Sequence, residues 1–429
     1  MLKKFKRPSF GRTKKSEPAQ PDHIIGLDIG TENVKALIGR IKGDEIEIIG
    51  VGRAHQHLAD MQAGAIADIA GVVTNCDEAL DAAEKMAGVS VRGTVIGIAG
   101  ELVKGTTTTV KFTRKDPSKP LDIPEIEKII GMVQAKALGK AKQQLAWELG
   151  GKEVEIRLVN SALVSITIDG YVVSSPMGFQ GRDVMIQLYT AFAPLIHIGA
   201  LERTAHELDL DLLAVAAEPF AVARSIVGND PNANMSAILM DVGGGTTDIA
   251  ILNEGGVEGT KMFGIGGRAF TRSIERDLST DFDQAEILKL AIDSNKIPQH
   301  KRGQITDALN KTLEVWTSGV ELALGEFTKL DHLPHRILLC GGGSSLGMLM
   351  DTLAETRWYG GLPFTRKPVV EHIEPIQVTG IVDKTGVVTD HTYITAMGLL
   401  RVGLDTINQQ NPDHNAGSIK ERINRLLSV

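Results

Sequence analysis

The sequence contains few cysteines and no long uninterrupted apolar run. Cys76 and Cys340 are the only cysteines among 429 residues, which excludes a disulfide framework and favours a reducing compartment. No stretch approaches the roughly 20 apolar residues that a membrane-spanning helix needs, and no signal peptide is visible. The formal net charge of −7 gives no electrostatic reason to expect nucleic-acid binding. A hydrophobic content of 42% instead predicts a soluble protein with about two to four domains or subdomains.

One local pattern is present twice, as IIGLDIGTENVKALIG at Ile24–Gly39 and as ILMDVGGGTTDIAIL at Ile238–Leu252. In each copy an apolar run ends in an aspartate, Asp28 or Asp241, and a glycine-bearing turn and a second apolar run follow. Such a turn lets the backbone approach a phosphate, because glycine accepts positive φ and has no Cβ. The aspartate can hold a hydrated divalent cation beside that phosphate. The repeat therefore predicts two similar lobes that close on one nucleotide.

A third glycine turn follows another buried-looking strand. Ile337–Cys340 reads as the strand, Gly341–Gly343 as the turn and Leu346–Leu353 as the start of a helix. Either GGGSSL or a single Asp-x-Gly could be structural on its own. GGGTTD is more specific, because three consecutive glycines cost backbone entropy that packing does not offset. Together and in this order, the three turns predict one site.

The segments between these turns predict a divided α/β protein. Three strand-like runs fill Ile24–Arg53, and helical spacing follows over about 65–86. The block 92–178 combines a Thr-rich strand, a helix over about Pro124–Leu149 with Asp122 as its cap, and two further strands. This block is expected to be a small α+β insertion in the first lobe.

The two ends of the chain differ from the rest. Residues 1–21 carry seven Lys or Arg within their first fifteen positions, which indicates a disordered basic tail or a second contact with an anionic membrane. At the other end, residues 405–416 have the composition of a linker. Ser418 and Glu421 then form a capping box.

The last thirteen residues have the spacing of a short basic amphipathic helix. Its apolar positions share one face and its basic positions lie elsewhere around it; they are Ile419, Ile423, Leu426 and Leu427, and Lys420, Arg422 and Arg425. Such a helix on a flexible tether is expected to bind a membrane surface. The alternative is a helix docked on its own core.

The quoted motifs resemble those of the actin-like ATPases. GLDIGTENVK, MDVGGGTTDIAI and LLCGGGSSLGML are similar to the two phosphate motifs and the adenosine motif of that superfamily. AVAAEPFAVA and YITAMGLLRVG are similar to its two connecting helices. GGRAFTR at Gly266–Arg272, AEILK at Ala285–Lys289 and the position of the insertion resemble FtsA-like cell-division proteins. The resemblance covers about Ile24–Gly403.

The resemblance implies an actin-like fold with these units: a basic tail (1–21), a first lobe (22–91 and 179–225) with an inserted α+β subdomain (92–178), a second lobe (226–403), a linker (404–416) and an amphipathic helix (417–429). It implies ATP and Mg²⁺ as ligands. Asp28 and Asp241 would hold Mg²⁺ through water. The phosphate contacts would come from Gly30, Thr31, Asn33, Gly243, Gly244, Gly245 and Thr246. The nucleoside contacts would come from Glu286, Lys289, Gly342, Gly343 and Ser344.

Glu218 and Asn33 differ from the other expected site residues. Glu218 lies where the superfamily orients the attacking water, although a carboxylate before Pro219 could instead cap a turn. Asn33 stands where many family members carry a basic residue.

The implied function is that of an ATP-binding, filament-forming adaptor with slow ATPase activity at most. It would tether the C-terminal tail of FtsZ, and with it the division ring, to anionic lipid on the cytoplasmic face of the cell membrane. It would also contact itself and other divisome proteins. The alternatives are a PilM-like pilus-assembly adaptor and an ATP-dependent small-molecule kinase of the same superfamily. A kinase would need a polar substrate pocket with a catalytic base in the first lobe, and the sequence offers no such constellation.

Overall fold

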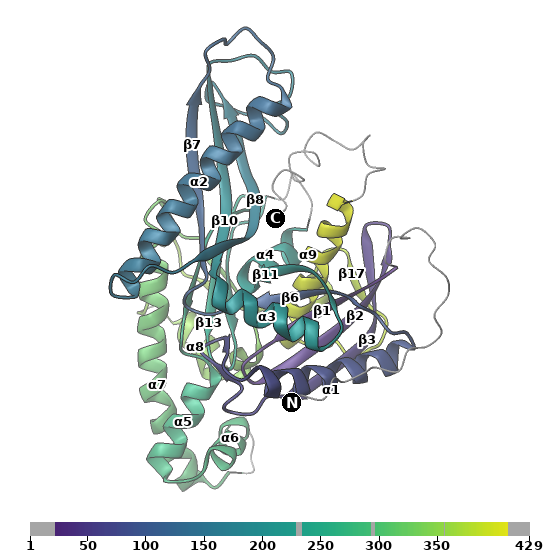
Figure 1. Ribbon diagram of the computed structural model, residues 1–429. Coiled ribbons are helices and arrows are strands. Elements are labelled where there is room, and N and C mark those ends of the chain that lie inside the picture. The colour runs from purple at the N-terminus through teal and green to yellow at the C-terminus, as the bar shows by residue number, and fades with distance from the viewer. Residues whose placement is uncertain (1–21, 229–233, 293–296, 356, 411–429) are drawn as a thin grey trace.

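The computed structural model describes residues 22–228, 234–292, 297–355 and 357–410 (Figure 1). The predicted basic tail (1–21) and amphipathic helix (417–429) therefore lie outside the described residues. Within them, no helix combines the length and apolarity that crossing a membrane requires.

The first lobe is built on a six-stranded sheet with the order β11-β6-β1-β2-β3-β17. Its strands are β1 (His23–Ile29), β2 (Asn33–Lys42), β3 (Glu45–His55), β6 (Gly93–Ile98), β11 (Asp211–Ala217) and β17 (Ile381–Asp383). β1, β2 and β3 form the predicted antiparallel meander, and β6 and β11 continue the sheet in parallel. Helix α1 (Ile69–Ala87) covers β3, where Gly52 permits the contact because a Cβ there would lie 1.8 Å from the Ala79 carbonyl oxygen.

α1 begins later than the expected position 65. A short hairpin of β4 (Met61–Gln62) and β5 (Ala65–Ile66) occupies the preceding residues, and the Asp68 side chain accepts a hydrogen bond from the Ala70 amide to cap the helix.

The second lobe repeats the topology of the first. Its strands are β12 (Ala237–Val242), β13 (Thr247–Asn253), β14 (Gly256–Phe263), β15 (Arg336–Cys340) and β16 (Val369–His372). β12, β13 and β14 form an antiparallel meander, while β15 and β16 extend the sheet in parallel on the other side of β12. The order β16-β15-β12-β13-β14 thus matches β11-β6-β1-β2-β3 strand for strand. The duplication predicted from the two Asp-Gly patterns is confirmed.

Helices and a separate apolar core complete the second lobe. The helices are α5 (Gly267–Leu278), α6 (Phe282–Leu290), α7 (Gln299–Gly325) and α8 (Gly347–Ala354), with the short 3₁₀ turn η1 (Gly342–Ser345) before α8. Trp316 of α7 is fully buried in this core and donates its indole N–H to the Thr247 hydroxyl at 2.9 Å. That bond ties α7 to the strand that leaves the glycine turn.

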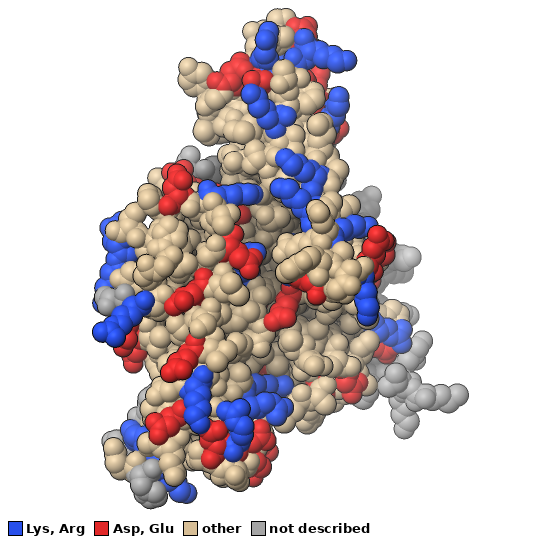
Figure 2. Space-filling view, turned by 90° about the vertical axis from the view of Figure 1, so that its left-hand side faces the viewer, with Lys and Arg blue, Asp and Glu red and all other residues tan. Residues whose placement is uncertain are grey.

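The inserted subdomain extends above the two lobes (Figure 1). It consists of β7 (Lys104–Thr113), α2 (Ile123–Glu148), β8 (Ile156–Ile168), β9 (Tyr171–Val172) and β10 (Asp183–Pro194). Asp122 caps α2 as predicted, accepting from the Glu125 amide at 3.1 Å. Figure 2 shows the subdomain projecting from the body, with basic and acidic side chains interspersed over the face in view.

Strand pairing places the subdomain differently from the expected block 92–178. β6 lies inside that block but pairs with β1, and β10 lies beyond it but pairs with both β7 and β8. The subdomain sheet also continues into the second lobe, because β14 pairs with β7 at Gly259–Thr106 and Thr260–Gly105.

Three further helices connect the parts: α3 (Leu195–Glu207), α4 (Glu218–Val227) and α9 (Ile394–Gln410). α4 and α9 pack closely, since a Cβ at Gly398 would lie 2.3 Å from the Ala221 carbonyl oxygen. The expectation that a linker begins near residue 404 is wrong as far as Gln410, because α9 continues to that residue. Asp405 accepts hydrogen bonds from Arg224 and pairs with Arg401, which holds this last part of α9 on the core.

Candidate functional site

A cavity of about 470 Å³ lies where the turns between β1 and β2, between β12 and β13, and after β15 meet. The predicted residues that line it are Asp28, Gly30, Thr31, Asn33, Glu218, Asp241, Gly243, Gly244, Thr246, Glu286, Lys289, Gly342 and Gly343. Two predicted residues lie behind this lining. Gly245 packs on the Thr31 side chain, and the Ser344 hydroxyl donates to the Gly341 carbonyl oxygen at 2.7 Å.

The glycine turns pack directly on one another. Gly341 has φ +82°, and a Cβ there would lie 1.9 Å from Asp241 Oδ1. A Cβ at Gly245 would lie 2.7 Å from Thr31 Oγ1, so the two phosphate-type turns touch across the cleft. Only glycine permits these distances, so the missing side chains of Gly245 and Gly341 let the three turns pack closely around the cavity.

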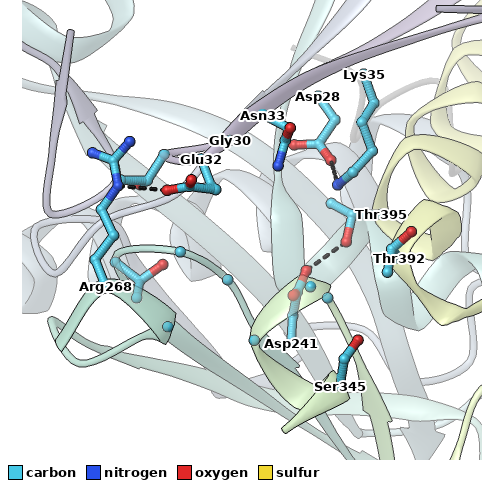
Figure 3. Close-up of a pocket in the computed structure, with 18 of the residues that line it drawn as sticks. Asp28, Gly30, Glu32, Asn33, Lys35, Asp241, Arg268, Ser345, Thr392 and Thr395 are labelled. Carbon is cyan, nitrogen blue, oxygen red and sulfur yellow. Dashed lines mark hydrogen bonds and ion pairs between the residues drawn. The ribbon is translucent and has the colours of Figure 1, made fainter. Parts of the chain in front are cut away.

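The two hairpins present their aspartates with different cross-strand partners. In the first hairpin Asp28 lies opposite Lys35, whose Nζ is 2.9 Å from Asp28 Oδ2. In the second hairpin Asp241 lies opposite a further aspartate, Asp248. Asp241 accepts instead from the Thr395 hydroxyl of α9 at 2.5 Å (Figure 3).

Sequence reasoning missed both cross-strand residues. The spacing could have predicted them. Lys35 and Asp248 each lie seven residues after the aspartate of their hairpin, on the returning strand. Lys35 also supplies a basic group two residues beyond Asn33, on the same face of β2.

Burial and mutual repulsion alter the acidity of this cluster. Burial, followed by the charges of Asp28, Asp248 and Asp241, raises the pKa of Glu218 well above its ordinary value. Burial and then Asp241 raise the pKa of Asp248, and burial and then Asp28 raise that of Asp241. Burial alone would lower the pKa of Lys35, but the Asp28 carboxylate raises it overall. Four buried carboxyl groups, those of Asp28, Glu218, Asp241 and Asp248, therefore lie close together near the Lys35 ammonium group.

Glu218 lies at the start of α4, over the first sheet. A Cβ at Gly97 would lie 2.8 Å from Glu218 Oε1, so the missing side chain of Gly97 makes room for the carboxyl. The residue that caps α4 is Ala217, which makes no side-chain capping bond. Glu218 is thus the first residue of α4 and not its cap residue, and its expected role beside the attacking water stays a prediction.

Glu286 and Lys289 lie together on one wall, on α6. Lys289 Nζ is 2.8 Å from Glu286 Oε2 and donates to the Gly267 carbonyl oxygen at 3.1 Å and to the Thr271 hydroxyl at 2.9 Å. The wall is thus fixed by contacts to α5 and offers both a carboxylate and an ammonium group.

A second ion pair closes one side of the cavity between the lobes (Figure 3). Arg268 of α5 donates to Glu32 Oε2 at 2.7 Å and reaches the carbonyl oxygens of Gln56 and Leu58. No local pattern predicts this pair, because 236 residues separate Arg268 from Glu32.

Two stacked imidazoles support the third glycine turn. The rings of His372 and His391 lie 3.9 Å apart and nearly parallel. Nε2 of His391 is 3.0 Å from the Ser345 hydroxyl, and Nε2 of His372 is 3.0 Å from the Ser344 carbonyl oxygen. Burial and then His372 lower the pKa of His391 to about 4, so this ring is neutral near neutral pH.

The acidic cluster fits a hydrated cation. Among the residues that the structure describes, no group of three or more His, Cys, Asp or Glu is spaced to ligate a metal ion directly. Asp248 Oδ1 is nevertheless buried without a hydrogen-bond partner, and four carboxylates share the region. Mg²⁺ usually retains several of its waters and is held by one or two carboxylates and substrate phosphates, which suits such a site.

Comparison with known proteins agrees with this geometry. A family profile described as "Cell division protein FtsA" matches residues 238–398. Curated proteins of that name from Pseudomonas aeruginosa and Bacillus subtilis are each 25% identical, over 402 and 268 residues. These matches cover 89% and 62% of this chain and 89% and 57% of the relatives. Over most of its length the chain is similar to the cell-division protein FtsA.

A solved structure shows the same fold. The PilM-PilN type IV pilus biogenesis complex gives a TM-score of 0.64 at 17% identity and covers 90% of this chain and 99% of that chain. The fold is that of the actin-like ATPases, as predicted. The segment 238–398 that matches the FtsA profile contains the second hairpin, the third glycine turn and the start of α9.

Proposed function

We propose that this FtsA-like protein is an ATP-binding assembly protein that links the FtsZ division ring to the cytoplasmic face of the cell membrane. The observation that carries the nucleotide part is the meeting of three glycine turns around one cavity, with an aspartate at the end of each central strand. The similarity to FtsA supports a role in cell division.

Different residues would contact different parts of the proposed nucleotide. Backbone of the two phosphate-type turns would bind the β- and γ-phosphates, and Asp28 and Asp241 would hold Mg²⁺ through water. Glu286 and Lys289 would meet the ribose and adenine, opposite Gly342 and Gly343. Bound Mg²⁺ would neutralise phosphate charge.

Glu218 would position the attacking water. Burial and the neighbouring carboxylates raise the pKa of its carboxyl group, which favours the protonated form more than in an ordinary glutamate, and a neutral carboxylic acid is a poor general base. This supports a nucleotide that serves assembly, with slow hydrolysis at most.

The membrane contact rests on the sequence of the last thirteen residues. Four aliphatic residues contribute roughly 1 to 2 kcal/mol each when partly buried in lipid, against the cost of ordering the segment. One copy is therefore a marginal anchor, and polymerisation would multiply its effect through avidity.

Co-sedimentation with anionic vesicles, ATP and FtsZ tests this proposal. The full chain should sediment with the vesicles and carry FtsZ with it, whereas a chain truncated after Ala416 should carry neither. Ile423→Asp should lose vesicle binding, while the matched control Asn424→Asp, which adds the same charge off the apolar face, should retain most of it. Equal sedimentation of the full and truncated chains would refute the membrane part.

The two alternatives make different predictions. The likeness to the PilM-PilN complex is one of fold, so it does not favour a pilus adaptor over a division protein. A small-molecule kinase would release a phosphorylated metabolite on incubation with ATP, and that result would overturn the adaptor function.

A further inference from the structure

Lys35 is placed so that it neutralises the first aspartate from within the fold. It lies on β2 as the cross-strand partner of Asp28, and the exposed fractions of the two side chains are 12% and 5%. The ion pair is therefore largely shielded from water. Removing one member of such a pair leaves a buried charge uncompensated, which is far more costly than removing both.

The other basic residues around the cavity have other partners. Arg268 pairs with Glu32, Lys289 pairs with Glu286, and the Arg53 Nε donates to Asn33 at 3.0 Å. Against them stand four buried carboxylates, Asp28, Glu218, Asp241 and Asp248. Within the described cavity, Lys35 is the cation that these carboxylates share.

We propose that the Lys35 ammonium is a built-in counter-ion for this site. It holds Asp28 when no divalent cation is bound, and a hydrated divalent cation competes with it for that carboxylate. This inference rests on the cation site of the proposed function and adds a property to it: the first lobe remains charge-balanced without metal. Asp28 in the first hairpin is thereby protected from an uncompensated charge when no ligand is bound.

A purely structural ion pair would behave differently. If Lys35 only fastens β1 to β2, its removal lowers stability by the same amount with and without metal. If it stands in for a cation, an added divalent cation restores the stability that its removal costs.

The experiment compares the thermal midpoints of the full chain and of Lys35→Met, without nucleotide, in EDTA and in rising MgCl₂. We expect MgCl₂ to raise the midpoint of Lys35→Met by roughly 5 °C or more and that of the wild type by about 1 °C or less. An equal response of the two proteins would overturn the inference. If Lys35→Met does not fold, Lys35→Gln purified in MgCl₂ replaces it, and its midpoint should fall when EDTA is added; no fall contradicts the proposal.

Two controls separate charge balance from general loss of stability. Lys104→Met removes a lysine whose Nζ is 2.7 Å from Glu148, with side-chain exposures of 17% and 27%, and MgCl₂ should not restore its midpoint. Asp28→Asn/Lys35→Met removes both charges, and its midpoint in EDTA should lie above that of Lys35→Met. A double variant as unstable as the single one contradicts the proposal.

ATP titration of the same samples distinguishes a failure of the counter-ion inference from a failure of the proposed function. If MgCl₂ restores the thermal midpoint of Lys35→Met but the protein binds no ATP, the counter-ion inference stands and the proposed function is refuted. ATP binding by the wild type without metal rescue of the variant would refute the counter-ion alone.

Discussion

The two hairpins that face the cavity share one topology but differ in charge. β1–β2 and β12–β13 each place an aspartate at the end of a central strand, and each pairs it with the residue seven positions later. That residue is Lys35 in the first hairpin and Asp248 in the second. Duplication thus explains the shape of the site, while the difference at this one position determines how each half tolerates an empty cavity.

The first hairpin is balanced by its own lysine, whereas the second requires a proton or an external cation. Like charges directly opposite in an antiparallel pair are destabilising, and burial adds to the cost. Burial, followed by the charge of Asp28, raises the pKa of Asp241, and burial, followed by the charge of Asp241, raises the pKa of Asp248. The second lobe is therefore the half that is expected to respond most to bound ligand.

The largest expected effect comes from the glycine turn beside the second hairpin. Gly341→Ala should lower the free energy of unfolding by about 3 kcal/mol or more, because it adds backbone strain and a Cβ that collides with Asp241. Gly43→Ala is the matched control, since it has φ +61° with no atom within 4 Å, and should cost only about 1 kcal/mol. Urea unfolding measures both. Equal losses would show that the turn does not pack on the aspartate as described.

Asp248→Asn should raise the stability of the protein in EDTA, whereas a substitution of Lys35 should lower it. Removing the like charge opposite Asp241 should stabilise the protein in EDTA by about 1 kcal/mol, because a buried carboxylate is replaced by a neutral amide. The urea midpoint in EDTA is the measurement. Destabilisation by this variant would contradict the account of the second hairpin.

The acidic cluster also predicts the pH dependence of stability without metal. Raised carboxyl pKa values mean that the folded state binds more protons than the unfolded state, so stability falls as pH rises above the ordinary carboxyl range. The thermal midpoint in EDTA should therefore fall as the pH rises from the ordinary carboxyl range towards the raised pKa values of the cluster. The lowered pKa of His391 acts in the other direction, with stability lost as pH falls from 6.5 to about 4.

Asp248→Asn should flatten the alkaline limb of this profile, and His391→Gln the acidic one. A wild-type midpoint that rises steadily as the pH increases above the ordinary carboxyl range would show that the carboxylates are not strained by one another.

A smaller effect than that of Gly341→Ala is expected at the ion pair that links the lobes. Arg268→Ala should lower the free energy of unfolding by about 1 to 2 kcal/mol, because the Arg268–Glu32 pair is partly buried, with exposures of 11% and 25%. Arg40→Ala removes an exposed pair with Glu47 inside the first lobe and should be almost silent. If the two substitutions are equivalent in urea unfolding, Arg268 has no special role between the lobes.

Local patterns predicted the parts of the fold that depend on turn chemistry. The two meanders and the cap of α2 follow from short stretches of sequence, which is why their prediction succeeded. The predicted start of the linker was wrong, because Arg224 donates a hydrogen bond to Asp405 from 181 residues away. This contact holds polar residues of linker-like composition in helix α9. The limits of the inserted subdomain were wrong for a similar reason, since strand partners far along the chain assign β6 and β10 to their sheets.

The site shows the same division. The aspartates and glycines were predictable because a phosphate turn needs them at fixed spacing. The Arg268–Glu32 pair and the Thr395–Asp241 bond were not, because each joins residues more than 150 positions apart. Lys35 is intermediate between the predictable and the unpredictable residues. Its position opposite Asp28 can be predicted from the sequence, but its role depends on the buried carboxylates that the fold places around it.

The most direct measurement of the central claim is a calorimetric titration of ATP in MgCl₂ into the wild type, Asp28→Asn and Asp241→Asn. If the two hairpins hold one nucleotide between them, the wild type binds one ATP per chain, and each substitution weakens binding by about tenfold or more. No binding by the wild type, or an affinity unchanged in both variants, would contradict it.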